Sequence, residues 1–274
     1  MALSSVRKYF RTPKGIVTIV LAILTAVAAP GEGIGLVLPE LAAAIGVAVV
    51  LDAVVMRIGD GRWTYPDGAL LTGWIIALIL SPHERWWVAG AASAIAIVTK
   101  HAFRGRAANV FNPAAVALVA VYYLFDSAQS WWGALPDAPA PAIVALFATG
   151  LFVTDRVNKM PLVVTFLGAW FAFATAGAFV DSPATFAELY RAPDAHAALF
   201  FAFFMATDPP TSPPRQRDQV TYGGIAAASA FAVFRWVGAV HFLLSGLLVA
   251  NLWEAWRRRA QWKSTAAKRA PVAA

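Results

Sequence analysis

Long apolar stretches separated by short polar segments are the main feature of the chain. A helix needs about 20 apolar residues to cross the hydrocarbon core of a bilayer. Stretches of this length or somewhat shorter predict ten helical segments, at Gly15–Ala29, Gly35–Met56, Pro66–Leu80, Trp86–Phe103, Pro113–Phe125, Pro141–Thr154, Pro161–Val180, His196–Thr207, Val220–Val237 and Val240–Trp256. The pattern therefore predicts an all-α, polytopic transmembrane helical bundle that forms a single membrane domain over residues 1–274.

The composition excludes a soluble protein. Of the 274 residues, 59% are hydrophobic and 14% are charged, whereas about a quarter of a soluble domain is charged. The chain has no cysteine, which excludes disulfides, thiolate-held iron–sulfur clusters and a thiol nucleophile. The net charge of +7 is spread between the apolar stretches rather than gathered in one patch, so no nucleic-acid partner is expected.

The basic residues orient the segments. If the N-terminus is cytoplasmic, only Arg85, Arg191 and Arg235 of the 22 Lys and Arg residues fall on the outer side. Cytoplasmic loops carry an excess of Lys and Arg, so this partition predicts ten spans with both termini inside. It also predicts a basic cytoplasmic N-terminus at 1–14 and a basic tail at 257–274, which suits an anionic inner leaflet.

Pairs of tryptophans stand where membrane interfaces are expected. Trp side chains are enriched at the headgroup level of membrane proteins. We therefore expect interfacial anchors at Trp86, Trp87, Trp131, Trp132, Trp253 and Trp256.

Three polar or proline-containing breaks interrupt the apolar pattern, at Tyr65–Gly73, Asn109–Ala114 and Met205–Arg215. Helical membrane proteins place their functional groups at such breaks. The topology predicts that all three lie on the cytoplasmic side, close to a basic rim. A shared position at one depth predicts a common site.

The first two breaks have the residues of a capped helix start. Asp67 with Pro66, and Asn112 with Pro113, are expected to cap a helix and turn its backbone amides towards a cavity. Such a terminus favours phosphate, carboxylate or a reduced quinone or flavin ring. In the third break, consecutive prolines stop the helix, and Asp208 lies at the end of it.

The third and eighth segments are both short and interrupted by Gly or Pro. They are the third members of two sets of five, which predicts two inverted five-helix repeats. We place the first half at 15–140 and the second at 141–256.

Other polar residues in the segments point to less defined roles. The four histidines do not face one another at mid-membrane as haem ligands would, and no His, Asp or Glu cluster has metal-ligand spacing, so no metal site is expected. Glu40, Asp52 and Asp155 leave two interpretations open: a proton or ion path, or capping near an interface.

The three breaks also carry a family resemblance. Asp67–Gly73 reads DGALLTG, Phe111–Ala114 reads FNPA and Phe203–Pro209 reads FFMATDP. With these motifs the chain resembles the NqrB/RnfD family, whose members are membrane subunits of the sodium-translocating NADH:quinone oxidoreductase and of the Rnf electron-transport complex. The resemblance implies a urea-transporter-like inverted repeat in the bacterial inner membrane. It also implies a flavin-carrying subunit that exchanges electrons with quinone or with partner membrane subunits carrying iron–sulfur or flavin.

One departure from the family limits the cofactor. Members of the family attach FMN to a threonine in a long outer loop between the fifth and sixth spans. The corresponding loop here, Asp126–Ala140, is short and contains no threonine. Covalent FMN is therefore not expected. Two alternatives stay open: a noncovalent cofactor, which would be FMN, riboflavin or a quinone, or no flavin.

Three functions remain open at this point. The first is an electron-transfer subunit with a noncovalent flavin or quinone, and the second is a small-solute or ion transporter or channel on the same inverted-repeat fold. The third is a scaffold subunit without a cofactor. The predicted cofactor-binding residues are Asp67, Gly68, Thr72, Lys100, Asn112, Pro113, Thr207, Asp208 and Arg215.

Overall fold

The computed structural model describes residues 7–61, 63, 65–104, 109–181 and 183–269. The ends of the predicted basic N-terminus and tail, residues 1–6 and 270–274, lie outside this part of the chain. The helices are α2 (Pro13–Glu32), α3 (Ile34–Asp60), α4 (Asp67–Ile79), α5 (Trp86–Ala102), α6 (Pro113–Phe125), η1 (Trp132–Ala134), α7 (Ala140–Arg156), α8 (Met160–Val180), α9 (Pro183–Ala187), η2 (Glu188–Tyr190), α10 (Asp194–Phe200), η3 (Phe201–Met205), α11 (Gln216–Ala232), η4 (Val233–Val237) and α12 (Phe242–Arg269).

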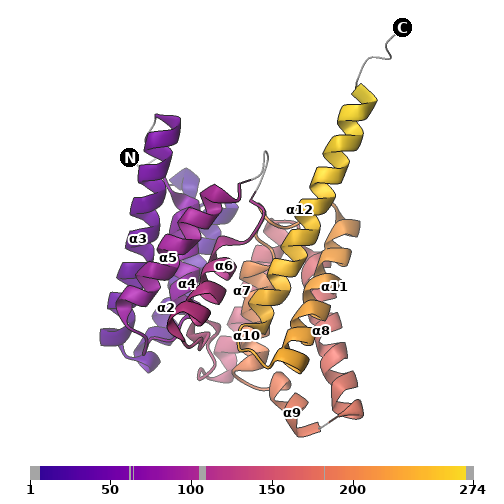
Figure 1. Ribbon diagram of the computed structural model, residues 1–274. Coiled ribbons are helices and arrows are strands. Elements are labelled where there is room, and N and C mark those ends of the chain that lie inside the picture. The colour runs from indigo at the N-terminus through magenta and orange to yellow at the C-terminus, as the bar shows by residue number, and fades with distance from the viewer. Residues whose placement is uncertain (1–6, 62, 64, 105–108, 182, 270–274) are drawn as a thin grey trace.

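The predicted helical segments are confirmed to within a few residues at most of their ends. The predicted separation at Gly238 holds because this residue adopts a left-handed backbone with φ 68°, which glycine adopts without strain. The eighth segment is α10 continued by the π-helical turn η3. The largest difference is α12, which continues through Arg269 into the predicted tail and projects beyond the other helices (Figure 1).

Helix length and apolarity mark the chain as a membrane protein. In the part of the chain that the structure describes, α2, α3, α8 and α11 with η4 are long and apolar enough to cross a bilayer. The helices α4, α6 and α10 with η3 are apolar but shorter. In the described residues, these helices indicate an all-α, multi-pass membrane protein.

The helices form two groups that meet along their sides. In the first group α3 packs against α4 and α5, and in the second α11 packs against α8 and α12. Small residues permit this close approach. A Cβ at Gly73 would lie 2.5 Å from the Ala44 carbonyl oxygen, and one at Gly223 would lie 2.7 Å from that of Leu162. The absence of a side chain at both glycines therefore allows the helix backbones to approach each other closely.

We expect Gly223→Val to destabilise the bundle by about 1–3 kcal/mol, the usual cost of overpacking a close contact. The added atoms would meet the backbone of α8, which cannot move as a flexible side chain can. Thermal unfolding in detergent, followed by tryptophan fluorescence, measures the effect. Gly224→Val is the matched control because no atom lies within 4 Å of its Cβ position. Equal losses in both variants would contradict the packing role.

The prediction that Trp131 and Trp132 anchor the outer interface is wrong. Trp132 is fully buried, Trp131 is nearly so, and the Trp132 indole donates to the Ala77 carbonyl over 2.6 Å. Trp131 and Leu135 have left-handed backbones, which fold the loop back onto the end of α4. The loop therefore closes the bundle, whereas Trp86, Trp87 and Trp256 are exposed, and their role as interfacial anchors stays a prediction.

Candidate functional site

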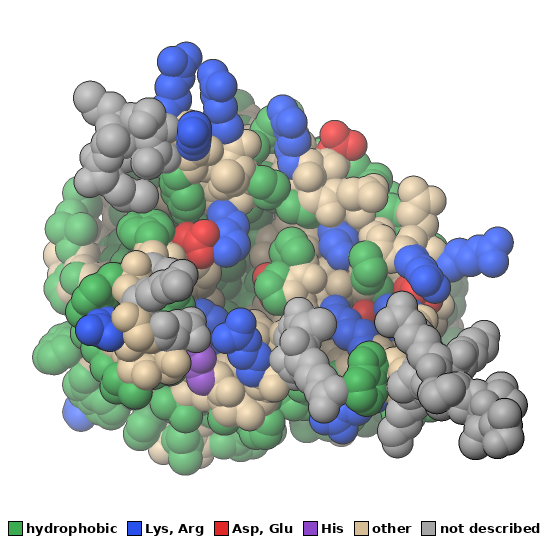
Figure 2. Space-filling model, turned by 90° about the horizontal axis from the view of Figure 1, so that it is seen from above, with side chains coloured by type: hydrophobic (Ala, Val, Ile, Leu, Met, Phe, Trp, Pro, Cys, Tyr) green, Lys and Arg blue, Asp and Glu red, His purple; other side chains and the backbone are tan. Residues whose placement is uncertain are grey.

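The three breaks in the apolar pattern meet around one cavity of about 600 Å³. It is lined by residues of α2 to α7, of η3 and of the third break, and it lies at the end of the bundle from which α12 projects (Figure 1). Figure 2 views the molecule from this end and shows Lys and Arg side chains spread over the face. Of the predicted cofactor-binding residues, the cavity wall contains Asp67, Gly68, Thr72, Lys100, Asn112, Pro113, Thr207 and Asp208.

Arg215 is the exception among the predicted residues. It is the N-cap residue of α11, its side chain is exposed, and it does not line the cavity. The prolines before it turn the chain away from the cavity after Pro210. The structure therefore gives Arg215 no contact with a ligand in the cavity.

The second break forms as predicted. The Asn112 side chain accepts the Ala115 amide over 3.1 Å and caps α6, with Pro113 as its first residue. The backbone N–H of Asn112 donates to Asn251 Oδ1 on α12 over 2.8 Å, and Asn251 Nδ2 donates to the Tyr222 hydroxyl. All of these groups are buried. The second group of helices thus holds the start of α6 in place.

The first break differs from the prediction in one respect. Pro66, not Asp67, is the N-cap residue of α4, and no side chain caps this helix. The Asp67 carboxylate lies in the first turn and pairs with Lys14 of α2 over 2.7 Å. An acidic group in the first turn still stabilises the helix end. Asp67 therefore links α2 to α4 at the cavity instead of capping the start of α4.

The second lysine of the cavity is paired as well. Lys100 Nζ lies 2.8 Å from Asp52 Oδ1, and His101 Nε2 lies 2.7 Å from the same oxygen. The Asp52 carboxylate is almost fully buried. Because both lysines already have a carboxylate partner, the cavity has no surplus of positive charge. Such a site is poorly suited to a phosphate group, which requires uncompensated cations or free amides.

Two hydroxyls of the predicted site are used within their own helices. Thr72 donates to the Gly68 carbonyl over 2.8 Å, and Thr207 donates to the Phe203 carbonyl over 2.6 Å. Each hydroxyl oxygen keeps acceptor capacity. Both residues line the cavity, so they offer acceptors rather than donors there.

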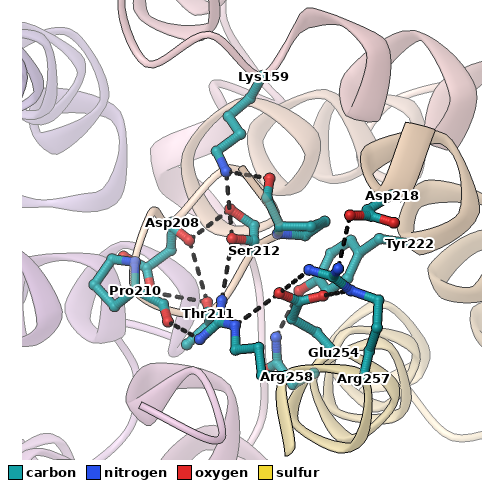
Figure 3. Close-up of polar contacts among 12 residues, drawn as sticks. Lys159, Asp208, Pro210, Thr211, Ser212, Asp218, Tyr222, Glu254, Arg257 and Arg258 are labelled. Atoms are coloured by element: carbon teal, nitrogen blue, oxygen red, sulfur yellow. Dashed lines mark hydrogen bonds and ion pairs between the residues drawn. The ribbon is translucent and has the colours of Figure 1, made fainter. Parts of the chain in front are cut away.

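Cations hold the carbonyl groups of the third break (Figure 3). Lys159 Nζ donates to the carbonyls of Pro213 and Ser212 over 2.6 and 3.3 Å. Arg258 of α12 donates to the carbonyls of Pro210 and Ser212 over 2.9 and 3.2 Å. The proline-rich segment has few amides of its own, so these two side chains tie it to α8 and α12, while the Asp208 carbonyl accepts from the amides of Thr211 and Ser212 within the segment.

A buried glutamate fixes the arginines. Glu254 is 1% exposed, and its carboxylate accepts from Arg257 over 2.7 and 2.8 Å and from Arg258 over 2.7 Å. Arg257 also pairs with Asp218 of α11 over 2.7 Å. This network was missed in the sequence. The only signal was Glu254 near the end of an apolar segment, with Arg257 and Arg258 three and four residues later, one helical turn away.

Two groups at the third break have shifted pKa values. Burial lowers the pKa of Lys159 to about 8, although Asp208 and Glu254 oppose this effect. Burial raises the pKa of Asp208 above its ordinary value, while the Thr211 hydroxyl, which donates to its carboxylate over 2.9 Å, and Lys159 oppose the rise.

We expect the low pKa of Lys159 to make stability depend on pH. Between about pH 8 and the ordinary lysine pKa of about 10.4, the unfolded chain binds more protons than the folded chain. The free energy of unfolding therefore rises with pH in this window, by up to about 1.4 kcal/mol per pH unit from this group. Unfolding of the unmodified protein and of Lys159→Met should be compared from pH 7 to pH 10.5. Equal pH slopes in the two proteins would contradict the expectation.

The fold and the site together define an all-α membrane protein with a largely apolar cavity where the three breaks meet, bordered by a few polar side chains. The chain belongs to the NQR2, RnfD, RnfE family, whose model matches residues 4–149 and 140–255. The resemblance expected from the three motifs is thereby confirmed.

Several curated relatives are described alike, each as the D-type subunit of an ion-translocating oxidoreductase complex. The Stutzerimonas stutzeri protein is 46% identical over 72 residues, which are 26% of this chain and 20% of that protein. The Halorhodospira halophila protein is 26% identical over 249 residues, covering 61% of this chain and 70% of its own length. The Shewanella sediminis protein is 23% identical over 281 residues, with 76% and 80% coverage. The chain spans 20–30% of the length of the first three relatives it matches.

Proposed function

We propose that the chain is a membrane electron-transport subunit that binds a phosphate-free flavin, or a quinone, noncovalently in the cavity where the three breaks meet. The observation that carries this proposal is the meeting of all three family motifs around one cavity of about 600 Å³. This size lies within the usual range for small-molecule sites. Motifs that lie far apart in the sequence converge on this cavity, and their convergence favours a shared binding site.

The cavity combines a ring-sized apolar wall with polar groups at its rim. Leu71, Ile75, Phe203 and Phe204 provide apolar surface, and Asn109 adds an amide. The starts of α4 and α6 both reach the cavity, and the partial positive charge of a helix start stabilises electron-rich oxygen atoms, although most amides of these two first turns already have hydrogen-bond partners. When bound, the flavin or quinone supplies the electron-carrying chemistry, and the protein groups orient it and tune its potential.

The pairing of charges favours riboflavin or quinone over FMN. Lys14 and Lys100 are each paired with an aspartate, and Asp208 adds a carboxylate to the wall. A phosphate would meet these carboxylates without an unpaired cation to hold it. The threonine-free loop 126–140 offers no attachment for FMN either.

The packing of the helices supports two inverted five-helix repeats. The second helix of each set packs on the fourth (α3 on α5, α8 on α11), and the fourth packs on the fifth (α5 on α6, α11 on α12). The two sets contact each other through their first helices, α2 and α7, and through their fifth helices, α6 and α12. Equivalent contacts in two sets are what an internal repeat requires. On this proposal all ten segments cross or enter the membrane.

The proposed orientation places the cavity at the cytoplasmic face of a bacterial inner membrane, with both termini on that side. The excess of basic residues at this end supports it. The curated relatives are described as subunits of an ion-translocating oxidoreductase complex. By analogy, the partners here are further membrane subunits. They must supply any iron–sulfur relay, because this chain has no cysteine.

Visible absorption of the purified protein tests the proposal. We expect a flavin spectrum from protein prepared in mild detergent, and acid precipitation should release the colour to the supernatant as riboflavin rather than FMN. If the protein is colourless, organic extraction should yield a quinone. Colour that stays with the pellet would contradict noncovalent binding. A protein without flavin or quinone that catalyses solute uptake in liposomes would instead support the transporter.

A further inference from the structure

Glu40 of α3 is a buried carboxyl group that the cavity does not use. It is 1% exposed, and neither carboxylate oxygen has a hydrogen-bond partner among the described residues. Its buried neighbours on the same helix face are apolar: Val37, Leu41 and Ala44. Carboxyl groups inside a membrane segment are costly and mark ion or proton pathways. A buried carboxyl group without a partner is thus a candidate for a functional role.

The surroundings of Glu40 favour a proton over a metal cation. An ionised carboxylate without a partner is strongly disfavoured in an apolar environment, whereas the neutral acid is tolerated. Hard metal cations require about six or more oxygen ligands, and no described residue offers Glu40 even one hydrogen-bond partner. The described residues contain no group of three His, Asp or Glu side chains that could hold a metal.

The charged groups that act on Glu40 lie towards the end of the molecule opposite the cavity. Glu32, at the end of α2, and Glu84, between α4 and α5, are close enough to interact with it electrostatically. Both are partly exposed. The other charged or titratable side chains on α2, α4 and α5, the helices packed against α3, all lie at their cavity ends: Lys14, Asp67, Lys100 and His101. Glu40 thus lies nearer to this end of the molecule than to the cavity, and the basic groups beside Glu84 at this end are His83 and Arg85.

A second unpartnered polar group lies deeper in the same helix interface. Ser93 of α5 is fully buried, and its hydroxyl has no partner among the described residues. The neighbouring Gly90 faces Ala43 and Val47 of α3, and Ile97 packs with Ala48. Since Ser93 stands between Gly90 and Ile97, it lies at a level between Glu40 and Asp52. Buried hydroxyls without partners are places where water or a proton relay is expected.

We propose that Glu40 is the outer proton-binding residue of a relay that runs along the interface of α3 and α5 to Asp52 at the cavity. This relay rests on the membrane placement and electron-transport role proposed above. Glu40 and Asp52 are separated by about 18 Å along the helix, at 1.5 Å per residue. The Glu40 O–H bond breaks, and its proton passes to the first of several hydrogen-bonded waters that would enter the interface past the Ser93 hydroxyl, because one hydrogen bond spans only about 3 Å. The last water passes a proton to the Asp52 carboxylate, whose hydrogen bond to His101 leads on to the cavity side. No group is oxidised or reduced, and Glu40 regains a proton from the side of Glu84.

Labelling with dicyclohexylcarbodiimide tests the protonated state directly in the full-length chain. The O–H of a carboxylic acid adds across a C=N bond of the reagent and leaves a stable adduct that mass spectrometry locates. An exposed glutamate with an ordinary pKa of about 4.3 is only about 0.2% protonated at pH 7. We therefore expect labelling of Glu40 at pH 7 to exceed that of exposed Glu188 by at least about tenfold. Glu254, buried but paired with two arginines, is the matched control and should stay unlabelled.

The relay itself is tested in membrane vesicles that contain the assembled complex, with reduced methyl viologen as electron donor. We expect Glu40→Gln to lower coupled proton movement by about tenfold or more while electron transfer continues, and Glu188→Gln to leave both unchanged. Glu40→Asp, which keeps a titratable group, should restore part of the proton movement. Absence of labelling at Glu40, protection of the label by Na⁺, or unchanged proton movement in Glu40→Gln would overturn the proposal. If the unmodified vesicles show no electron transfer, the proposed function fails, and the labelling still decides whether Glu40 holds a proton.

Discussion

Glu254→Gln is expected to lower the free energy of unfolding by about 3–5 kcal/mol, the usual loss when one partner of a buried ion pair is removed. The amide has no charge, so Arg257 and Arg258 would remain close together without their shared anion. Arg258 would then lose the geometry with which it holds the carbonyls of Pro210 and Ser212. The third break should therefore loosen together with the global loss of stability.

The comparison that isolates this effect is Glu188→Gln. Glu188 also faces an arginine one helical turn away, Arg191, but both side chains are more than 60% exposed and the atoms are 3.6 Å apart. Exposed pairs contribute about 0–1 kcal/mol. Thermal or denaturant unfolding in detergent, followed by tryptophan fluorescence, measures both variants. A loss in Glu254→Gln no larger than that in Glu188→Gln would show that the network does not hold the third break.

The helices were predictable because their determinants are local. Apolar length marks each segment, and proline or glycine marks its ends. Pro113 starts α6 at the residue predicted, and Gly238 separates η4 from α12 as predicted. The end of α12 was not predictable in this way. Its basic residues suit a solvated tail as well as a helix. Between the start of α12 at Phe242 and Pro271 the sequence has no proline that would end the helix.

The cavity was predictable because its walls are the breaks themselves. Backbone at membrane depth can leave the helix only where it lines a cavity or is covered by protein, so three breaks on one side predict one site. The pairs within the wall were not predictable. Lys14 finds Asp67 and Lys100 finds Asp52 across helix interfaces. Which side chains meet there depends on the rotation and height of each helix, which the apolar pattern does not determine.

The burial of Trp132 was missed for a related reason. An aromatic pair in an outer loop is typical of an interfacial anchor, and nothing in its immediate sequence contradicts this interpretation. Two left-handed residues, Trp131 and Leu135, turn the loop inward so that the indole reaches the end of α4. Backbone conformations of this kind are rare outside glycine and asparagine. They follow from tertiary packing rather than from local preference.

Gly68→Phe is expected to abolish ligand binding with little effect on the fold. Gly68 lies in the first turn of α4 and lines the cavity, and the nearest atom to a Cβ at this position is Lys100 Nζ, 4.0 Å away. A phenyl ring would extend into the space between the three motifs without meeting backbone atoms near its Cβ. It would occupy volume that a flavin or quinone ring needs. We expect affinity to fall by at least about 100-fold, or about 2.7 kcal/mol.

Gly168→Phe provides the matched control for this substitution. Gly168 is exposed on α8, outside the cavity wall, and no atom lies within 4 Å of its Cβ position. Both variants add the same ring to a helix, so a general effect of phenylalanine on folding should appear equally in each. The measurement is the ratio of extracted flavin or quinone to protein after purification, together with riboflavin titration by fluorescence quenching. Retention of the ligand by Gly68→Phe at the level of Gly168→Phe would place the ligand elsewhere. Loss in Gly68→Phe alone, at an unchanged unfolding temperature, would locate it among the three motifs, because the two proteins differ only in where the ring stands.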